Sequence, residues 1–174
     1  MLSEFPEDRL LYFWVRGTKE ALDREYPPVK LTSRTFSSYD NGVSMFDGKI
    51  LARKNVSIET FAQATPRSKF HVAASIEKDL IQQSDQGFII CADPNYGLAN
   101  IEVGLAHCLI RPLAAGCRNN GTVSKTAFKN TIKGALLNFS QSAEVVWGES
   151  LAIQLIDSHF QTWELLQTAR SKEK

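Results

Sequence analysis

The chain has 174 residues, of which 43% are hydrophobic and 22% are charged, as in an average globular protein. Twenty basic side chains against nineteen acidic ones leave a net charge of +1, which argues against intrinsic disorder and against a dedicated nucleic-acid-binding protein. No apolar stretch approaches the roughly 20 residues that span a bilayer, so we expect no membrane contact.

In the first half of the chain, short apolar or alternating runs between turn residues predict strands with brief helices among them. In chain order, we expect a strand at 10–15, a helix at 20–23, strands at 32–39 and 43–46, a helix at 58–64, a strand at 70–74 and a helix at 76–83. Asn41-Gly42 predicts a hairpin turn between the second and third strands. The extended pattern is expected to end at Asp47-Gly48.

In the second half, the run at 88–92 is the clearest buried strand, and a loop follows it. Residues 101–110 leave helix and strand open, because apolar side chains recur at helical spacing while Gly104 weakens a helix. Beyond a loop at 114–122, we expect a helix from Ser124 to Phe139, a strand at 143–147 and a helix at 151–169.

These elements predict an α+β fold, because strands and helices do not alternate regularly enough for a doubly wound parallel sheet. We expect one domain at 1–170, with mainly antiparallel strands in the first two-thirds and helices late in the chain, followed by a frayed tail at 171–174. The Gly-rich phosphate loops of the two best-marked nucleotide-binding folds are missing from the sequence.

The cysteines Cys91, Cys108 and Cys117 are odd in number and form no Cys-x-x-Cys pair. With no secretory signal in the sequence, this pattern predicts free thiols in a reducing compartment, and therefore a cytoplasmic protein. The histidines His71, His107 and His159 are far apart and have no metal-ligand spacing, so we expect no metal site.

A set of polar side chains next to aromatic strands is suited to chemistry on NAD. Arg16 ends the first strand, and its planar fork can hold a phosphate or ribose. A serine on a neighbouring strand supports the nicotinamide pocket, aromatic rings clamp the ring, and a Glu or His steadies the cation that develops. The predicted catalytic residues are Arg16, Ser44, His107 and Glu102, and the predicted cofactor-binding residues are Tyr12, Thr18, Ser38 and Phe46. Glu144 and Glu149 remain alternatives to Glu102.

The order of these segments resembles the ADP-ribosyltransferase-like superfamily, whose members carry Arg, then aromatic-Ser-Thr-Ser, then Glu on a split α+β fold. Residues 12–18 look like the first element, residues 36–38 or 43–46 like the second, and Glu144 or Glu149 like the third. The chain is also similar to two looser branches, the RES-type toxins and the small secreted toxins of the Tse-two type, and the latter carry a segment like the one at 41–45. The resemblance implies an NAD-cleaving toxin or effector with NAD as substrate and a protein target, antitoxin or immunity protein as partner.

A second resemblance is to a group of small bacterial proteins of unknown function, and it brings no activity with it. The matching segments are 42–44, 93–94 and 104–107.

Three classes of function stay open at this point: an NAD-cleaving transferase or glycohydrolase, a non-catalytic immunity, inhibitor or adaptor module, and a small metal-independent nuclease using His71 or His107. Each singled-out residue also has a structural interpretation, as a solvated strand end for Arg16, a bonded strand hydroxyl for Ser44 and a half-buried histidine for His107. An NAD enzyme should gather Arg16, Ser44 and a His or Glu around one aromatic-walled site, whereas a binding module should scatter them. A nuclease should gather basic side chains in one groove.

Overall fold

The computed structural model has a central β-sheet, in which strand β1 (Leu10–Arg16) lies between two neighbouring strands. Its side chains are buried on both faces, as its continuously apolar sequence predicts. The structure describes residues 4–16, 22–23, 30–31, 42–66, 71–82, 87–113, 116–117, 141–150, 153–154 and 157.

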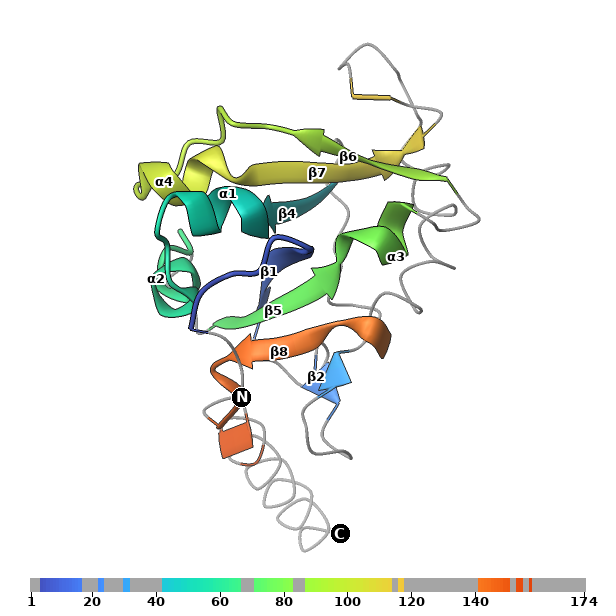
Figure 1. Ribbon diagram of the computed structural model, residues 1–174. Coiled ribbons are helices and arrows are strands. Elements are labelled where there is room, and N and C mark those ends of the chain that lie inside the picture. The colour runs from blue at the N-terminus through green and yellow to red at the C-terminus, as the bar shows by residue number, and fades with distance from the viewer. Residues whose placement is uncertain are drawn as a thin grey trace, which may run out of the picture.

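The sheet has six strands in the order β6-β7-β4-β1-β5-β8, and every neighbouring pair is antiparallel (Figure 1). The remaining strands are β4 (Val43–Asp47), β5 (His71–Glu77), β6 (Phe88–Ala92), β7 (His107–Pro112) and β8 (Glu144–Trp147). The predicted α+β class with mainly antiparallel strands is confirmed, as are the strands expected at 10–15, 43–46 and 88–92. The strands expected at 70–74 and 143–147 are confirmed over 71–74 and 144–147.

In the part of the chain that the structure describes, four short helices lie between the strands: α1 (Gly48–Arg53), α2 (Ile58–Gln63), α3 (Lys78–Gln82) and α4 (Ile101–Leu105). Helix α2 was predicted, and the Ser57 side chain caps it by accepting from the amide of Thr60. Helix α1 was missed, because Asp47-Gly48 was interpreted as a break. The Asp47 carboxylate instead accepts from the amide of Lys49 and starts a helix there.

Two further predictions need correction. The helix predicted at 20–23 is wrong where the structure describes it, since Leu22–Asp23 forms strand β2 and pairs with β3 (Lys30–Leu31). The ambiguous segment 101–110 is divided between α4 and β7, so both interpretations hold for part of it. The strand predicted at 32–39 and the helix predicted from Ser124 lie outside the described residues, as do most of the helix at 151–169 and the tail.

Each face of the sheet has its own hydrophobic core. The first core gathers one set of alternating side chains, such as Leu11, Met45 and Ile110, with Ile81 of α3. The second core holds the other set, including Tyr12 and Phe46, under helices α1, α2 and α4. Figure 1 shows these three helices grouped together, with α3 apart from them. None of the described helices is long and apolar enough to cross a bilayer.

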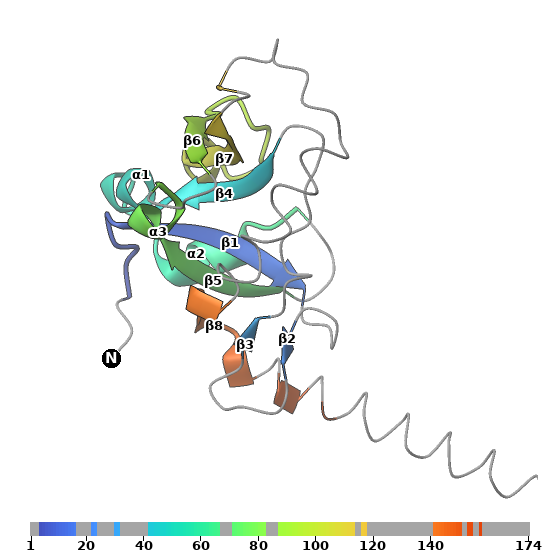
Figure 2. The same ribbon diagram turned by 90° about the vertical axis from the view of Figure 1, so that its right-hand side faces the viewer.

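The sheet consists of two three-stranded halves joined by a short seam. Strand β1 pairs with β5 at seven positions, but with β4 only through Leu11–Asp47 and Tyr12–Phe46. Past these two positions the strands separate, and Figure 2 shows β4 and β1 close together at one end and diverging toward the other. The half formed by β6, β7 and β4 therefore parts from the half formed by β1, β5 and β8.

A disulfide joins Cys91 on β6 to Cys117 beyond β7, at a sequence separation of 26. The prediction of three free thiols is wrong for these two, since an odd cysteine count says nothing about which pairs the fold brings together. Cys108 is the free one and lies buried on β7. Burial raises the pKa of the Cys108 thiol to about 12, so it stays protonated and unreactive.

The number of reactive thiols tests this pairing. Alkylation in denaturant without reductant should modify one cysteine, and after reduction three, as counted by mass spectrometry. Reduction should lower the free energy of unfolding by roughly 3–4 kcal/mol, because it releases the constraint on the unfolded chain. Three modified cysteines without reductant would contradict the disulfide.

Gly48 is required by a close backbone approach at the start of α1. A Cβ there would lie 2.2 Å from the carbonyl oxygen of Glu7 and 2.7 Å from that of Leu10. Gly48→Ala should therefore lower the free energy of unfolding by roughly 1–3 kcal/mol in urea titrations. Gly97→Ala is the matched control, since nothing lies within 4 Å of its Cβ position. Equal effects of the two substitutions would show that the approach at Gly48 is not tight.

Candidate functional site

The alternation of side chains along β4 and β7 places Ser44 and His107 on the same face of the sheet. The buried residues Val43, Met45 and Cys108 alternate with these side chains along the two strands and point into the first core. Ser44, Phe46 and His107 therefore point to the opposite face of the sheet. Phe46 lies directly opposite His107, and Ser44 lies opposite Leu109. Ser44 and His107 are therefore diagonal neighbours on adjacent strands, close enough for their side chains to meet.

Hydrogen bonds join Ser44, His107 and Asp93 into a triad. The Ser44 Oγ lies 2.5 Å from His107 Nε2, and His107 Nδ1 lies 3.0 Å from Asp93 Oδ2. Asp93 follows β6 directly, where its backbone amide donates to the carbonyl of His107 at 2.9 Å. A carboxylate beside Nδ1 holds the proton on that nitrogen, so the Ser44 hydroxyl donates to a free Nε2.

The environment of His107 keeps its imidazole neutral. The side chain is 2% exposed, and this burial lowers its pKa below the ordinary value of 6.5, although the nearby Asp93 carboxylate acts in the opposite direction. Asp93 itself is 39% exposed, so water reaches its carboxylate. A neutral imidazole with a free Nε2 is a proton acceptor, which is the form that a general base requires.

Two aromatic rings fix the orientation of His107. The ring of Tyr96 stacks on the imidazole with centroids 3.8 Å apart and planes 12° apart, and Phe46 meets it edge-on at 5.2 Å. Gly104 makes the position of Tyr96 possible, because a Cβ at Gly104 would lie 2.8 Å from the Tyr96 carbonyl oxygen. The group that approaches Gly104 closely is therefore the backbone of Tyr96.

Ser44 lies where β4 parts from β1. The backbone N–H and C=O groups of successive residues in a strand point alternately to the two neighbouring strands. The amide of Asp47 donates to the carbonyl of Ala106 on the β7 side, so the N–H and C=O of Ser44, three residues earlier, point to the β1 side. The last residue of β4 that pairs with β1 is Phe46, two residues away from Ser44. The N–H and C=O of Ser44 therefore face the separation between the strands. On β1, the indole of Trp14 stacks against Phe61 and contacts Phe46, with its Nε1 donating to the Phe61 carbonyl.

The other predicted residues of the first strands lie as follows. Arg16 ends β1 opposite His71 of β5, and the structure describes its backbone position alone. Tyr12 is buried in the second core, and its hydroxyl accepts from the amide of Glu7 at 2.8 Å. Thr18 and Ser38 lie outside the described residues.

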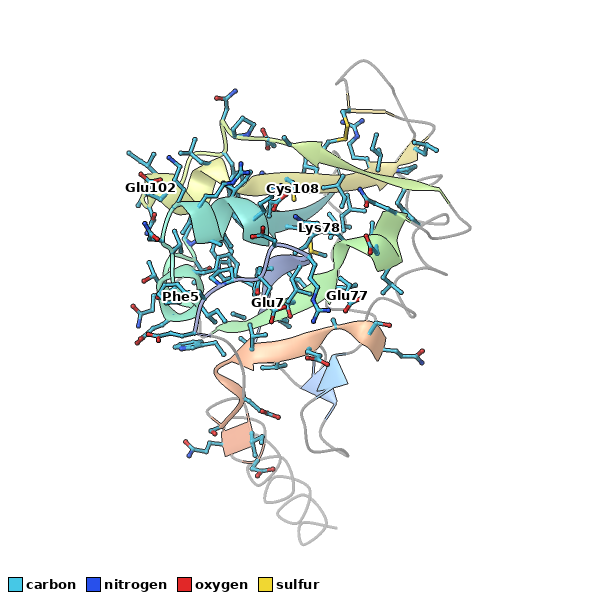
Figure 3. The ribbon with its side chains drawn as sticks, viewed as in Figure 1. Phe5, Glu7, Glu77, Lys78, Glu102 and Cys108 are labelled. Atoms are coloured by element: carbon cyan, nitrogen blue, oxygen red, sulfur yellow. A yellow bond between two sulfur atoms is a disulfide. The ribbon has the colours of Figure 1, made fainter. Side chains whose placement is uncertain are left out.

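The predicted acidic residue is not the one beside His107. Glu102 is on α4 and forms an ion pair with Lys54 at 3.4 Å, and Figure 3 shows it at the edge of the molecule formed by that helix. A helix ends between Glu102 and His107, so their separation of five residues does not bring them together. Glu149 follows β8, in the other half of the sheet.

Glu144 lines a cavity of about 310 Å³ that neither Ser44 nor His107 lines. Glu7 and Glu77 share this cavity, and Figure 3 shows them on the same side of the molecule.

Asp93 was missed as a functional residue, although its position carried a signal. It comes directly after the clearest buried strand, where a side chain is fixed by the sheet yet close to solvent. Its partner His107 begins the neighbouring strand, but β7 was not resolved from α4 in the sequence. Within the described ranges, no group of three His, Cys, Asp or Glu side chains is arranged to hold a metal ion.

The contact between Asp93 and His107 has a measurable consequence. Asp93→Asn should lower the pKa of His107 further, because the substitution removes the negative charge that favours the imidazolium. An NMR titration of the imidazole protons measures this pKa. Asp79→Asn on α3 is the control and should leave it unchanged. An unchanged or raised pKa in the Asp93 variant would mean that the carboxylate is not beside the ring in solution.

The chain was compared with known protein families, with characterised proteins and with solved structures, and none of these comparisons found a match.

Proposed function

We propose that the protein is an enzyme that cleaves the nicotinamide glycosidic bond of NAD at the triad of Ser44, His107 and Asp93. The observation that carries the proposal is the hydrogen bond between Ser44 and a neutral, oriented His107, next to aromatic side chains. Two of the residues predicted for NAD chemistry thus meet, at the place where the two halves of the sheet separate.

The reaction needs a base, an acceptor and a leaving group. His107 Nε2 takes the proton of the Ser44 hydroxyl, and that hydroxyl in turn takes a proton from the acceptor bound beside it, which is water or a hydroxyl of a target. The acceptor oxygen forms a bond to the ribose C1′ while the C1′–N bond breaks, and its electron pair leaves with nicotinamide. Asp93 stabilises the imidazolium that results, and the peptide groups of Ser44 offer a donor and an acceptor to the substrate.

The acceptor decides the biological role. Transfer to a protein would make the chain a toxin or effector with a macromolecular target, and transfer to water would make it a glycohydrolase. Both are proposals that rest on the same site. The cysteine count predicts a cytoplasmic protein. The disulfide between Cys91 and Cys117 instead favours a protein that functions in an oxidising compartment.

A second function is favoured by one specific observation. Ser44, His107 and Asp93 are bonded in the same order as the nucleophile, base and orienting carboxylate of serine hydrolases. In that reaction Ser44 Oγ attacks an acyl carbon, His107 takes its proton, and the Ser44 amide faces the separation between β4 and β1 as a donor to the oxyanion.

Nicotinamide release from NAD, followed chromatographically, tests the first proposal. His107→Gln should lower the rate on the order of 10²–10⁴-fold, because the base is lost, and Ser44→Ala should lower it as well. Glu59→Gln on the exposed face of α2 is the control and should behave as wild type. The wild-type rate should fall as the pH drops through the pKa of His107, which lies below 6.5, because protonation removes the base.

No release by wild type would reject NAD cleavage. A fluorophosphonate probe distinguishes the second function from the first. If the protein is a serine hydrolase, the probe should label Ser44 covalently and should leave the Ser44→Ala variant unlabelled.

A further inference from the structure

Arg111 lies beside Ser44 on the same face of the sheet. On β7, residues 107, 109 and 111 alternate to one side, and His107 and Leu109 lie opposite Phe46 and Ser44 of β4. Arg111 is therefore the next side chain along this row and lies diagonal to Ser44, with Cα atoms roughly 7–8 Å apart. The guanidinium is long enough to reach a group bound at Ser44.

The guanidinium of Arg111 is a buried charge without a described partner. Arg111 is 6% exposed, and its guanidinium makes no hydrogen bond or ion pair with any residue that the structure describes. An arginine side chain stays protonated in proteins, so burial cannot neutralise it. A buried charge is unfavourable unless an anion or several acceptors compensate for it. The position therefore calls for an anionic partner.

The backbone of β4 leaves room for this side chain to lean toward the site. A Cβ at Gly42 would lie 3.1 Å from Arg111 Cγ and 2.7 Å from the carbonyl oxygen of Ile110. Gly42 has φ +136°, which also disfavours a larger residue. The stem of Arg111 thus passes over Gly42, from β7 toward β4, and the separation between β4 and β1 lies beyond.

We propose that Arg111 binds a phosphate group of the substrate that reacts at Ser44 and His107. The planar fork of an arginine donates two parallel hydrogen bonds to a phosphate, which fixes the orientation of the molecule as well as its charge. This inference rests on the proposed site and narrows its substrate class to phosphorylated compounds. In NAD the group bound would be the pyrophosphate, separated from the glycosidic bond by one ribose.

The test measures binding of ADP-ribose and of inorganic pyrophosphate by calorimetry, with wild type, Arg111→Met, Arg111→Lys and the exposed control Arg9→Gln. Arg111→Met should weaken binding on the order of tenfold to a hundredfold, the range expected for lost hydrogen bonds to a charged group. Arg111→Lys should bind with an affinity between those of wild type and Arg111→Met, because lysine keeps the positive charge but lacks the planar fork of arginine. Arg9→Gln should bind as wild type.

Stability separates a binding role from a structural one. Replacing an unpaired buried charge by an apolar side chain of similar length should leave the free protein at least as stable as wild type in urea titrations. A marked loss of stability, or failure of Arg111→Met to fold, would show that Arg111 has a structural partner and would overturn the proposal. Unchanged affinity in a folded variant, or no anion binding by wild type, would overturn it too.

The outcomes for this inference and for NAD cleavage are distinguishable. Nicotinamide release with a wild-type KM in Arg111→Met would reject the phosphate site and leave the reaction standing. Binding of ADP-ribose that depends on Arg111, without any NAD turnover, would support the phosphate site and reject the reaction.

Discussion

The register between β4 and β7 is the constraint on which the candidate site depends. Phe46 opposite His107 and Ser44 opposite Leu109 place polar and aromatic side chains on one face, while Met45 and Cys108 fill the first core on the other. A shift by one residue would exchange the faces and bury Ser44 and His107 among apolar side chains. The apolar residues of these strands therefore fix the register, and the register brings the triad together.

The fold was predictable where local pattern and tertiary environment agree. The aromatic run of β1 is buried on both faces, the apolar run of β6 is partly buried at the edge of the sheet, and both were recognised as strands. Helix α1 was missed because Asp47-Gly48 serves equally well as a turn and as a helix start, and the carboxylate of Asp47 decides between them only once the backbone is placed. The disulfide depends in the same way on a spatial proximity that cysteine spacing does not contain.

The candidate site was predictable in part. Ser44 and His107 were singled out from short segments, and the structure joins them by a hydrogen bond across 63 residues of sequence. Asp93 and Tyr96 were not predicted from the sequence, because their role depends on how the loop after β6 folds back over the start of β7. Glu102 was chosen for its nearness in sequence, and a helix end between it and His107 separates the two. Arg111 drew no attention, since only burial distinguishes it from a solvated arginine.

The short seam between β1 and β4 affects how the molecule can move. Each half of the sheet has two strand pairings of its own, with three to seven register positions each, whereas the halves share two register positions. A sheet bends most easily where the fewest hydrogen bonds cross it, so the seam is the natural hinge line. Ser44 and Trp14 lie on opposite sides of that line. Rotation of one half against the other would change the distance between these two residues, and both hydrophobic cores would have to adjust, because each core holds side chains from both halves.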